Sequence, residues 1–297
     1  MLPAEFELIA THFRKLAGPG ARELADDAAV ITPPAGRELV LTTDAMVAGV
    51  HFLPDDPPDL VGRKLLRVNL SDLAAKGAMP LGYLMTVSAP VMTSDAWFAG
   101  LSAGLEEDQR RFGISLLGGD TTSTPGPITL SLTAIGHVAP GEAVSRAGAR
   151  VGDGVWVSGT VGDGALGLAV AQGRLSDPSG YLLSRYRLPQ PRLGLRLAGI
   201  ASAAMDVSDG LVQDLGHLCR AGRLGAEIEA ALVPISAPAR AAGADWLATC
   251  LTGGDDYELL LAIPPGNGER LAEAARAAGF QVTRIGEFRG TEPLVVV

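Results

Sequence analysis

The sequence predicts a globular protein of two domains, each built from helices and β-sheet. Its 297 residues exceed the usual size of a single hydrophobic core. The composition is 47% hydrophobic and only 19% charged, which suits substantial cores and differs from that of a disordered chain. Short apolar runs typical of strands alternate with segments of helical periodicity. We therefore expect an α+β fold.

The first half contains a helix signal that can be justified residue by residue. Ser94 is a typical N-cap, and Trp97, Phe98, Leu101 and Leu105 recur after it at helical spacing. The other elements expected here are a helix from Ala4 to Leu16, a strand from Glu38 to Thr42, a helix from Pro58 to Lys76 that ends at Gly77, and strands from Leu81 to Ser88, Ile114 to Leu117 and Ile128 to Val138.

A connector is expected from Val144 to Asp153, where Gly148 and Gly152 stand among polar residues. We accordingly place the first domain at residues 1–143 and the second at residues 144–297. The second domain is expected to contain a strand from Val155 to Ser158, a helix from about Gly162 to Gln172, an irregular segment from Ser176 to Pro191, helices at Leu193 to Ala203, Asp209 to Ala221 and Gly268 to Ala278, and strands at Glu258 to Ile263 and Gln281 to Glu287.

Charge and hydropathy argue against several classes of protein. The formal net charge of −9 is wrong for a general nucleic-acid binder, which needs basic surface to neutralise phosphates. The longest apolar stretches end well before the roughly 18 residues that a membrane span needs. The N-terminus lacks the basic start and apolar core of a signal peptide. We therefore expect a cytoplasmic protein without nucleic-acid or membrane partners.

Cysteine and lysine usage excludes further sites. Cys219 and Cys250 are the only cysteines, and neither belongs to a C-x-x-C pair, so no disulfide framework or zinc ribbon is expected. The three lysines, Lys15, Lys64 and Lys76, lie outside any G-x-x-x-x-G-K-[ST] loop. A P-loop nucleotide site is therefore not predicted.

Five short acidic clusters are the most informative feature of the chain. In three of them, Asp44, Asp120 and Asp209 follow an apolar strand-like run, and carboxylates at strand ends can converge on one crevice. Carboxylate and hydroxyl oxygens suit hard cations such as Mg²⁺, although Asp beside Gly, Ser or Thr is also common in turns and N-caps. The clusters are Asp26-Asp27, Thr42-Thr43-Asp44, Asn69-Leu70-Ser71-Asp72-Leu73, Gly118-Gly119-Asp120-Thr121 and Asp206-Val207-Ser208-Asp209-Gly210.

Together with other motifs, these clusters resemble the thiamine-monophosphate kinase family. The broader superfamily includes aminoimidazole ribonucleotide synthetase and selenophosphate synthetase. The resemblance runs in order from about residue 5 to residue 290. It is carried by Thr42-Thr43-Asp44 with His51-Phe52, the run from Asn69 to Ala78, Leu117-Gly-Gly-Asp120-Thr-Thr122, Ser145-Arg146-Ala-Gly148, Asp206-Val-Ser-Asp209-Gly-Leu211 and Gly253-Gly-Asp-Asp-Tyr-Glu-Leu259.

The resemblance implies a fold and a reaction. The fold would be an α+β arrangement of an N-terminal domain, with a small mixed sheet flanked by helices, and a C-terminal α/β domain. The N-terminal sheets of two copies would pair into a homodimer. The reaction would transfer the γ-phosphoryl group of ATP to thiamine monophosphate with several Mg²⁺ ions and no phosphoenzyme, giving thiamine diphosphate and ADP.

The resemblance also assigns residues. Asp44, Asp72, Asp120 and Asp209 would act in catalysis through positioning and electrostatics. The acceptor would be bound by His51 and Asp255. The ATP contacts would be Phe112, Gly119, Asp120, Arg146 and Ser208, and the metal ligands would be Asp27, Thr42, Thr43, Asp44, Asp72, Asp120, Asp206 and Asp209.

Ordinary structural roles remain open for three of these residues. Arg146 would suit solvent as well as a phosphate, Phe112 would suit a core, and His51 lies among apolar neighbours. The other histidines form no H-x-x-x-H pair, so zinc is not expected.

The chain departs from the family pattern in three places. The usual Gly-x-Gly-Asp-Asp is replaced by Glu23-Leu24-Ala25-Asp26-Asp27, which reduces backbone freedom. Asp255 stands where the family has Glu, one methylene longer. The sequence also ends at Val297, before the aromatic motif expected to stack on thiamine.

Three alternatives follow. The chain could be a related ATP-dependent enzyme with another small phosphate or amide acceptor, or a non-catalytic regulator that binds Mg²⁺ and nucleotide. An aspartyl phosphatase is disfavoured, because no D-x-D follows a strand.

Overall fold

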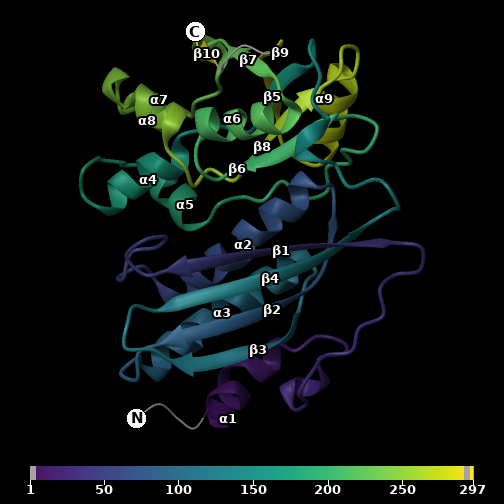
Figure 1. Ribbon diagram of the computed structural model, residues 1–297. Helices are drawn as coiled ribbons and strands as arrows, with labels where there is room; N and C mark the ends of the chain where they lie inside the picture. Colours follow the sequence, from purple (N-terminus) through teal and green to yellow (C-terminus); the bar gives the residue numbers. More distant parts are fainter. Residues whose placement is uncertain (1–4, 291–294, 297) are drawn as a thin grey trace. The chain divides into compact units, whose positions relative to one another are not determined.

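The computed structural model describes residues 5–290 and 295–296, and the chain forms two compact units (Figure 1). Among the described residues, no helix is both long enough and apolar enough to cross a membrane. The first unit consists of Met1–Leu73 and Met79–Ala139, and the second of Ala74–Ala78 and Pro140–Val297.

The first unit contains a four-stranded mixed sheet. Its order is β1 (Glu38–Val47), β4 (Thr129–Val138), β2 (Met79–Ala89) and β3 (Leu116–Ser123). Both β1 and β2 run antiparallel to β4, whereas β2 and β3 are parallel. Helices α2 (Pro58–Ala75) and α3 (Asp95–Phe112) lie behind this sheet in Figure 1 and leave its other face uncovered.

Sequence patterns explain these elements. Along β4, Leu130, Leu132 and Ala134 alternate with half-buried residues, because successive side chains of a strand point to opposite faces. The predicted cap of α3 is confirmed, since the Ser94 hydroxyl accepts a hydrogen bond from the Trp97 amide at 3.2 Å. The predicted N-terminal helix is confirmed from residue 5 onward as three short segments, and Ala4 lies outside the described residues. The segments are α1 (Glu5–Leu8), a π-helix (Ile9–Phe13) and a 3₁₀-helix (Arg14–Leu16).

The second unit contains a six-stranded sheet. All neighbouring strands are antiparallel except β10 and β7, which are parallel. The order is β10 (Val295–Val296), β7 (Gly225–Ile228), β9 (Val282–Arg289), β5 (Gly154–Ser158), β8 (Glu258–Ile263) and β6 (Ala203–Val207). The helices are α4 (Asp163–Ala171), α5 (Tyr181–Arg187), α6 (Leu211–Gly222), α7 (Ala237–Ala241), α8 (Leu247–Thr252) and α9 (Gly268–Ala277).

Strand β8 contributes to a core on each face of this sheet, and its predicted bounds are confirmed. Leu260 packs in a cluster with Leu215 of α6, whereas Leu261 packs in a second cluster with Leu271 of α9. A strand buried on both faces is a continuous apolar run, and this explains the sequence Leu-Leu-Leu-Ala-Ile.

Two predictions for the second unit are wrong. Residues 193–203 contain turns instead of a helix, because Gly194 and Gly199 adopt left-handed φ angles of 84° and 71°. The apolar residues there recur at every second position, with Leu195 and Leu197 buried. The segment 176–191 is not wholly irregular, since it contains α5.

Candidate functional site

Three predicted metal ligands lie together in the first unit. Thr42 and Asp44 are two residues apart on β1, so their side chains project from the same face of the sheet. The Thr42 hydroxyl donates a hydrogen bond to Asp72 Oδ2 on α2, with an oxygen–oxygen distance of 2.5 Å. Burial, together with the charge of Asp72, raises the pKa of Asp44 to about 6. The two carboxylates are therefore close enough to repel each other.

This group has the donor chemistry that Mg²⁺ requires. Its side chains offer only oxygen atoms, which hard divalent cations prefer. A cation bound by Asp44 and Asp72 would cancel the repulsion that contributes to the raised pKa. The residues present therefore fit a magnesium ion.

The position of these residues differs from the expectation in two respects. Asp44 lies inside β1, because the strand continues through the polar residues to Val47 and stays paired with β4. Thr43 faces the opposite side of the sheet, where its hydroxyl donates to the Leu132 carbonyl at 3.2 Å and accepts from Thr133 Oγ1 at 3.1 Å. The Thr43 hydroxyl is thus separate from the group formed by Thr42, Asp44 and Asp72.

Asp27 and Asp120 line a shared cavity of about 470 Å³ in the first unit. Asp120 lies within β3 and not beyond its end, and its carboxylate accepts a hydrogen bond from the Thr121 amide at 2.9 Å. Apolar residues such as Phe13 and Leu84 line other parts of the cavity. The structure therefore brings these two carboxylates to one cavity, although nearly a hundred residues separate them.

The loop before Asp27 keeps a glycine-like backbone without glycine. Arg22, Glu23 and Leu24 have φ angles of 49°, 57° and 56°, in the left-handed region that L-residues rarely adopt. Arg22 also forms an ion pair with Asp26. Arg22, Glu23 and Leu24 therefore hold a backbone conformation that suits glycine, and this conformation is strained for residues with side chains.

Two predicted ATP contacts have local structural partners. A Cβ atom at Gly119 would lie 1.7 Å from the Met85 carbonyl oxygen, so glycine is required for the close pairing of β2 and β3. The Phe112 ring lies 5.5 Å from the guanidinium carbons of both Arg67 and Arg111. Phe112 is not among the residues that line the cavity with Asp120.

His51 is exposed in the turn after β1, and its main chain is held in place. Its Nδ1 accepts a hydrogen bond from the Val47 amide at 3.1 Å, and the buried Lys64 ammonium donates to its carbonyl oxygen at 3.1 Å. Within residues 5–290, Nε2 has no such partner. The ring nitrogen opposite the turn is available to a ligand.

In the second unit, Ser208, Asp209 and Asp255 line a cavity of about 530 Å³. Arg174 and Gln213 line the same cavity and were not anticipated. Gln213 follows Asp209 by one helical turn and donates to its carboxylate at 3.1 Å, a spacing that the sequence could have revealed.

The remaining two predicted residues of this unit differ in exposure. Asp206 is buried within β6. Arg146 is exposed at the start of a short 3₁₀-helix, and its guanidinium makes no hydrogen bond or ion pair with the residues that the structure describes.

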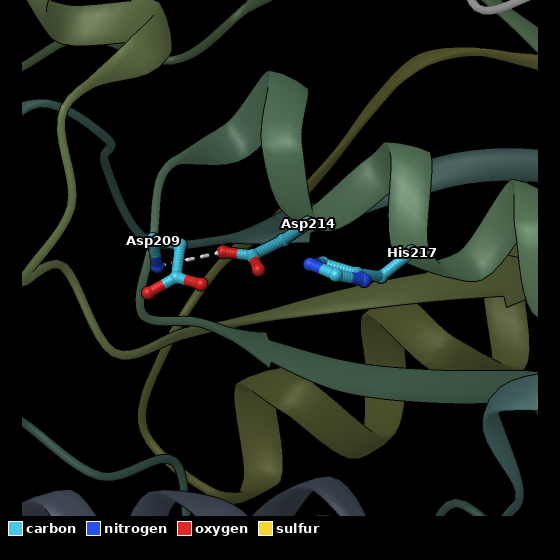
Figure 2. A group of neighbouring side chains, drawn as sticks. All are labelled: Asp209, Asp214 and His217. Atoms are coloured by element: carbon cyan, nitrogen blue, oxygen red, sulfur yellow. Dashed lines mark hydrogen bonds between the residues drawn. The ribbon is translucent and has the colours of Figure 1, made fainter.

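A carboxylate that sequence reasoning missed supports the loop at Asp209. The buried Asp214 accepts hydrogen bonds at Oδ2 from the amides of Asp209, at 2.9 Å, and Gly210, at 3.1 Å. Burial raises the pKa of Asp214 to about 6. Figure 2 shows His217 one turn further along α6. One ligand atom from each of Asp209, Asp214 and His217 lies within 4.8 Å of the others. The available signal was an acidic residue in the first turn of α6, where the amides of the helix N-terminus favour negative charge.

Comparisons with known proteins agree in both sequence and fold. Residues 25–138 match the family model of the AIR synthase related protein N-terminal domain, and residues 150–297 match that of the C-terminal domain. Thiamine-monophosphate kinase from Caulobacter vibrioides is 45% identical, over 96% of this chain and 84% of the relative.

Two solved structures extend the likeness to the fold. The crystal structure of thiamine-monophosphate kinase from Stenotrophomonas maltophilia K279a has a TM-score of 0.85 at 39% identity, covering 92% of this chain and 89% of that one. A structure of AaThiL complexed with AMPPCP and TMP has a TM-score of 0.80 at 30% identity, covering 91% and 87%.

Proposed function

The chain belongs to the thiamine-monophosphate kinase family, and we propose that it transfers the γ-phosphoryl group of ATP directly, in line, to the phosphate of thiamine monophosphate. It is an ATP-dependent kinase of thiamine monophosphate, and the products are thiamine diphosphate and ADP. The grouping of Thr42, Asp44 and Asp72 is the observation that best supports the Mg²⁺-assisted form of this reaction.

Each unit has its own set of proposed metal ligands. Asp44 and Asp72 bind Mg²⁺, and the Thr42 hydroxyl orients the carboxylate of Asp72. Thr43 contributes its main-chain oxygen, since its hydroxyl is on the other face. The further ligands are Asp27 and Asp120 in the first unit and Asp206 and Asp209 in the second.

Mg²⁺ supplies positive charge that offsets the repulsion between two anionic phosphate groups during in-line transfer. In the second unit, the unpaired guanidinium of Arg146 binds ATP phosphates and Ser208 is a further ATP contact. In the first unit, Gly119 contacts ATP and Phe112 lies against the adenine base. His51 and Asp255 bind the thiamine part of the acceptor. An acceptor phosphate oxygen is already a nucleophile, so the protein needs to position it and does not need a strong general base.

The uncovered face of the first unit's sheet supports a homodimer. Leu39, Leu41 and Leu84 lie on this face with exposed fractions of 40%, 62% and 42%. Contiguous exposed apolar side chains mark interaction surfaces, and pairing two such sheets also covers their edges. A second copy of the chain is the proposed partner, as expected from the family.

Purified protein incubated with Mg²⁺, ATP and thiamine monophosphate tests the proposal. Thiamine diphosphate measured by chromatography should form only when all three are present. ATP binding without thiamine diphosphate formation would favour the related-enzyme or regulator alternatives, and a panel of phosphate and amide acceptors would then separate these two.

A further inference from the structure

The segment Gly253–Tyr257, between α8 and β8, contains two strained residues. Asp255 and Tyr257 have φ angles of 70° and 53°, although neither is glycine. Residues in this region persist only where their surroundings hold them. Contacts on both sides of the segment must therefore fix its main chain.

On one side, the segment is bound to the last residue of β6 and to the loop that follows. The Asp255 amide donates to the Ser208 carbonyl at 2.9 Å, and the Tyr257 amide donates to the Val207 carbonyl at 2.8 Å. A Cβ atom at Gly254 would lie 2.2 Å from the Ser208 carbonyl oxygen, so the two main chains are in direct contact.

On the other side, the side chain of Asp256 fixes the segment to the start of α4. Its fully buried carboxylate accepts hydrogen bonds from the amides of Gly162, at 2.6 Å, and Gly164, at 3.0 Å. Arg185 donates to the main-chain oxygen of Asp256 at 3.0 Å and to Glu258 at 2.9 Å. Asp256 is thus held through both its side chain and its main chain.

Stability alone is a poor explanation for this carboxylate. Burial raises the pKa of Asp256 to about 8, despite the opposing effect of the glycine amides and Arg185. Buried ionisable groups often contribute less to stability than apolar residues of the same size. Their retention is better explained by the geometry that they impose.

That geometry concerns the preceding residue, Asp255. Asp255 lines the cavity of about 530 Å³ with Ser208 and Asp209, and the Tyr257 hydroxyl donates to its Oδ1 at 3.2 Å. A Cβ atom at Gly164 would lie 2.2 Å from the Asp255 carbonyl oxygen, so the residue that precedes Asp256 also contacts α4 directly.

We propose that Asp256 is a positioning residue for the acceptor site: by binding the amides of Gly162 and Gly164 it holds the strained main chain and directs the Asp255 carboxylate toward the acceptor. This inference rests on the proposed function, because it takes the acceptor to be thiamine monophosphate. Asp256 and Arg185 would then increase the affinity for thiamine monophosphate indirectly, by holding Asp255 in position.

The test is a double-mutant cycle between Asp255 and Asp256. Above pH 8, where the Asp256 carboxyl is ionised, Asp256→Asn keeps the shape of the side chain but can accept from only one glycine amide. It should raise KM for thiamine monophosphate about tenfold while KM for ATP stays within about twofold. In an Asp255→Ala background, adding Asp256→Asn should change KM for thiamine monophosphate less than twofold, because the residue being positioned is gone.

Arg185→Lys provides a second variant if Asp256→Asn does not fold. Lysine keeps a positive charge but lacks the planar guanidinium, whose Nη2 donates both to the Asp256 carbonyl and to Glu258. Its effect should have the same direction and should also vanish in the Asp255→Ala background. Additive effects, or equal effects on both substrates, would overturn the positioning role. A wild-type protein without thiamine-monophosphate turnover would overturn the proposed function and this inference together.

Discussion

Thr42 on β1 and Asp72 on α2 are joined by a hydrogen bond of 2.5 Å between Thr42 Oγ1 and Asp72 Oδ2. The bond fixes the carboxylate of Asp72. The negative charge of this carboxylate repels that of Asp44 and, together with burial, raises the pKa of Asp44. The first unit thus keeps two carboxylates together at the expense of its own stability. Such a cost is typical of residues kept for function.

Asp72→Asn should have opposite effects on activity and on stability. Asparagine keeps an acceptor for the Thr42 hydroxyl but removes the charge. We expect kcat to fall by about 100-fold or more, whereas the free energy of unfolding without Mg²⁺ should rise by up to about 1 kcal/mol. Steady-state kinetics and urea unfolding measure the two effects. A folded variant with unchanged kcat would remove Asp72 from the catalytic group.

Binding of Mg²⁺ at the proposed site should weaken in acid, because Asp44 must lose its proton before it can act as a ligand. The pKa of this carboxyl is about 6 in the metal-free protein, so the affinity for Mg²⁺ should decline up to tenfold per pH unit below that value. Calorimetry at pH 5.5 and 7.5 in two buffers should show proton release only at the lower pH. Asp214→Asn is the control, since it removes the other carboxyl whose pKa is raised to about 6. Loss of the pH dependence in that control would point to Asp214 instead.

The same shift sets the sign of the effect on stability. The pKa of Asp44 is about 6 in the folded chain, above its ordinary value of 3.8, so the folded state binds the proton more tightly. The contribution of protonated Asp44 to the free energy of unfolding is fully present below pH 3.8 and is lost as the pH rises through 6. Without Mg²⁺, this carboxyl should therefore lower the free energy of unfolding across that interval, and Asp44→Asn should remove the effect.

Glu23→Gly should stabilise the loop before Asp27. The φ angle of Glu23 is 57°, where an L-residue costs about 1–2 kcal/mol that glycine avoids. Glycine loses more entropy on folding, so the net gain should be up to about 1 kcal/mol. Glu23→Ala is the matched control, because it removes the same charge but keeps the strain. Equal unfolding midpoints for the two variants would show that strain at Glu23 is absent.

The sequence predicted most elements because their signals are local. The N-cap at Ser94 and the apolar run of β8 needed only neighbouring residues to be recognised. The extent of β1 depends on pairing with β4, so polar Thr42–Asp44 read as a strand end although they continue the strand. The wrong helix at 193–203 has a local cause instead, because Gly194 and Gly199 with left-handed φ angles interrupt that segment.

The sequence could predict the candidate site only in part, again because the arrangement of its residues depends on long-range contacts. Sequence motifs identified Asp44 and Asp72, but only the fold places them beside each other. Asp256 appeared merely as part of a motif, because its role depends on amides almost a hundred residues earlier in the chain. The left-handed backbone at Glu23 was equally invisible, since the glycines that would have indicated it are missing.

Leu41→Arg should prevent the proposed homodimer. Leu41 is 62% exposed and lies beside Ile135 on the uncovered face of the sheet, so an arginine there would place a charge in an apolar interface. Sedimentation at matched concentrations should show a dimer for the wild type and a monomer for the variant. Val151→Arg is the control, because Val151 is 63% exposed but belongs to a turn of the second unit. A wild type that stays monomeric at every concentration, or a Leu41→Arg variant that stays dimeric, would show that this face does not hold the dimer together.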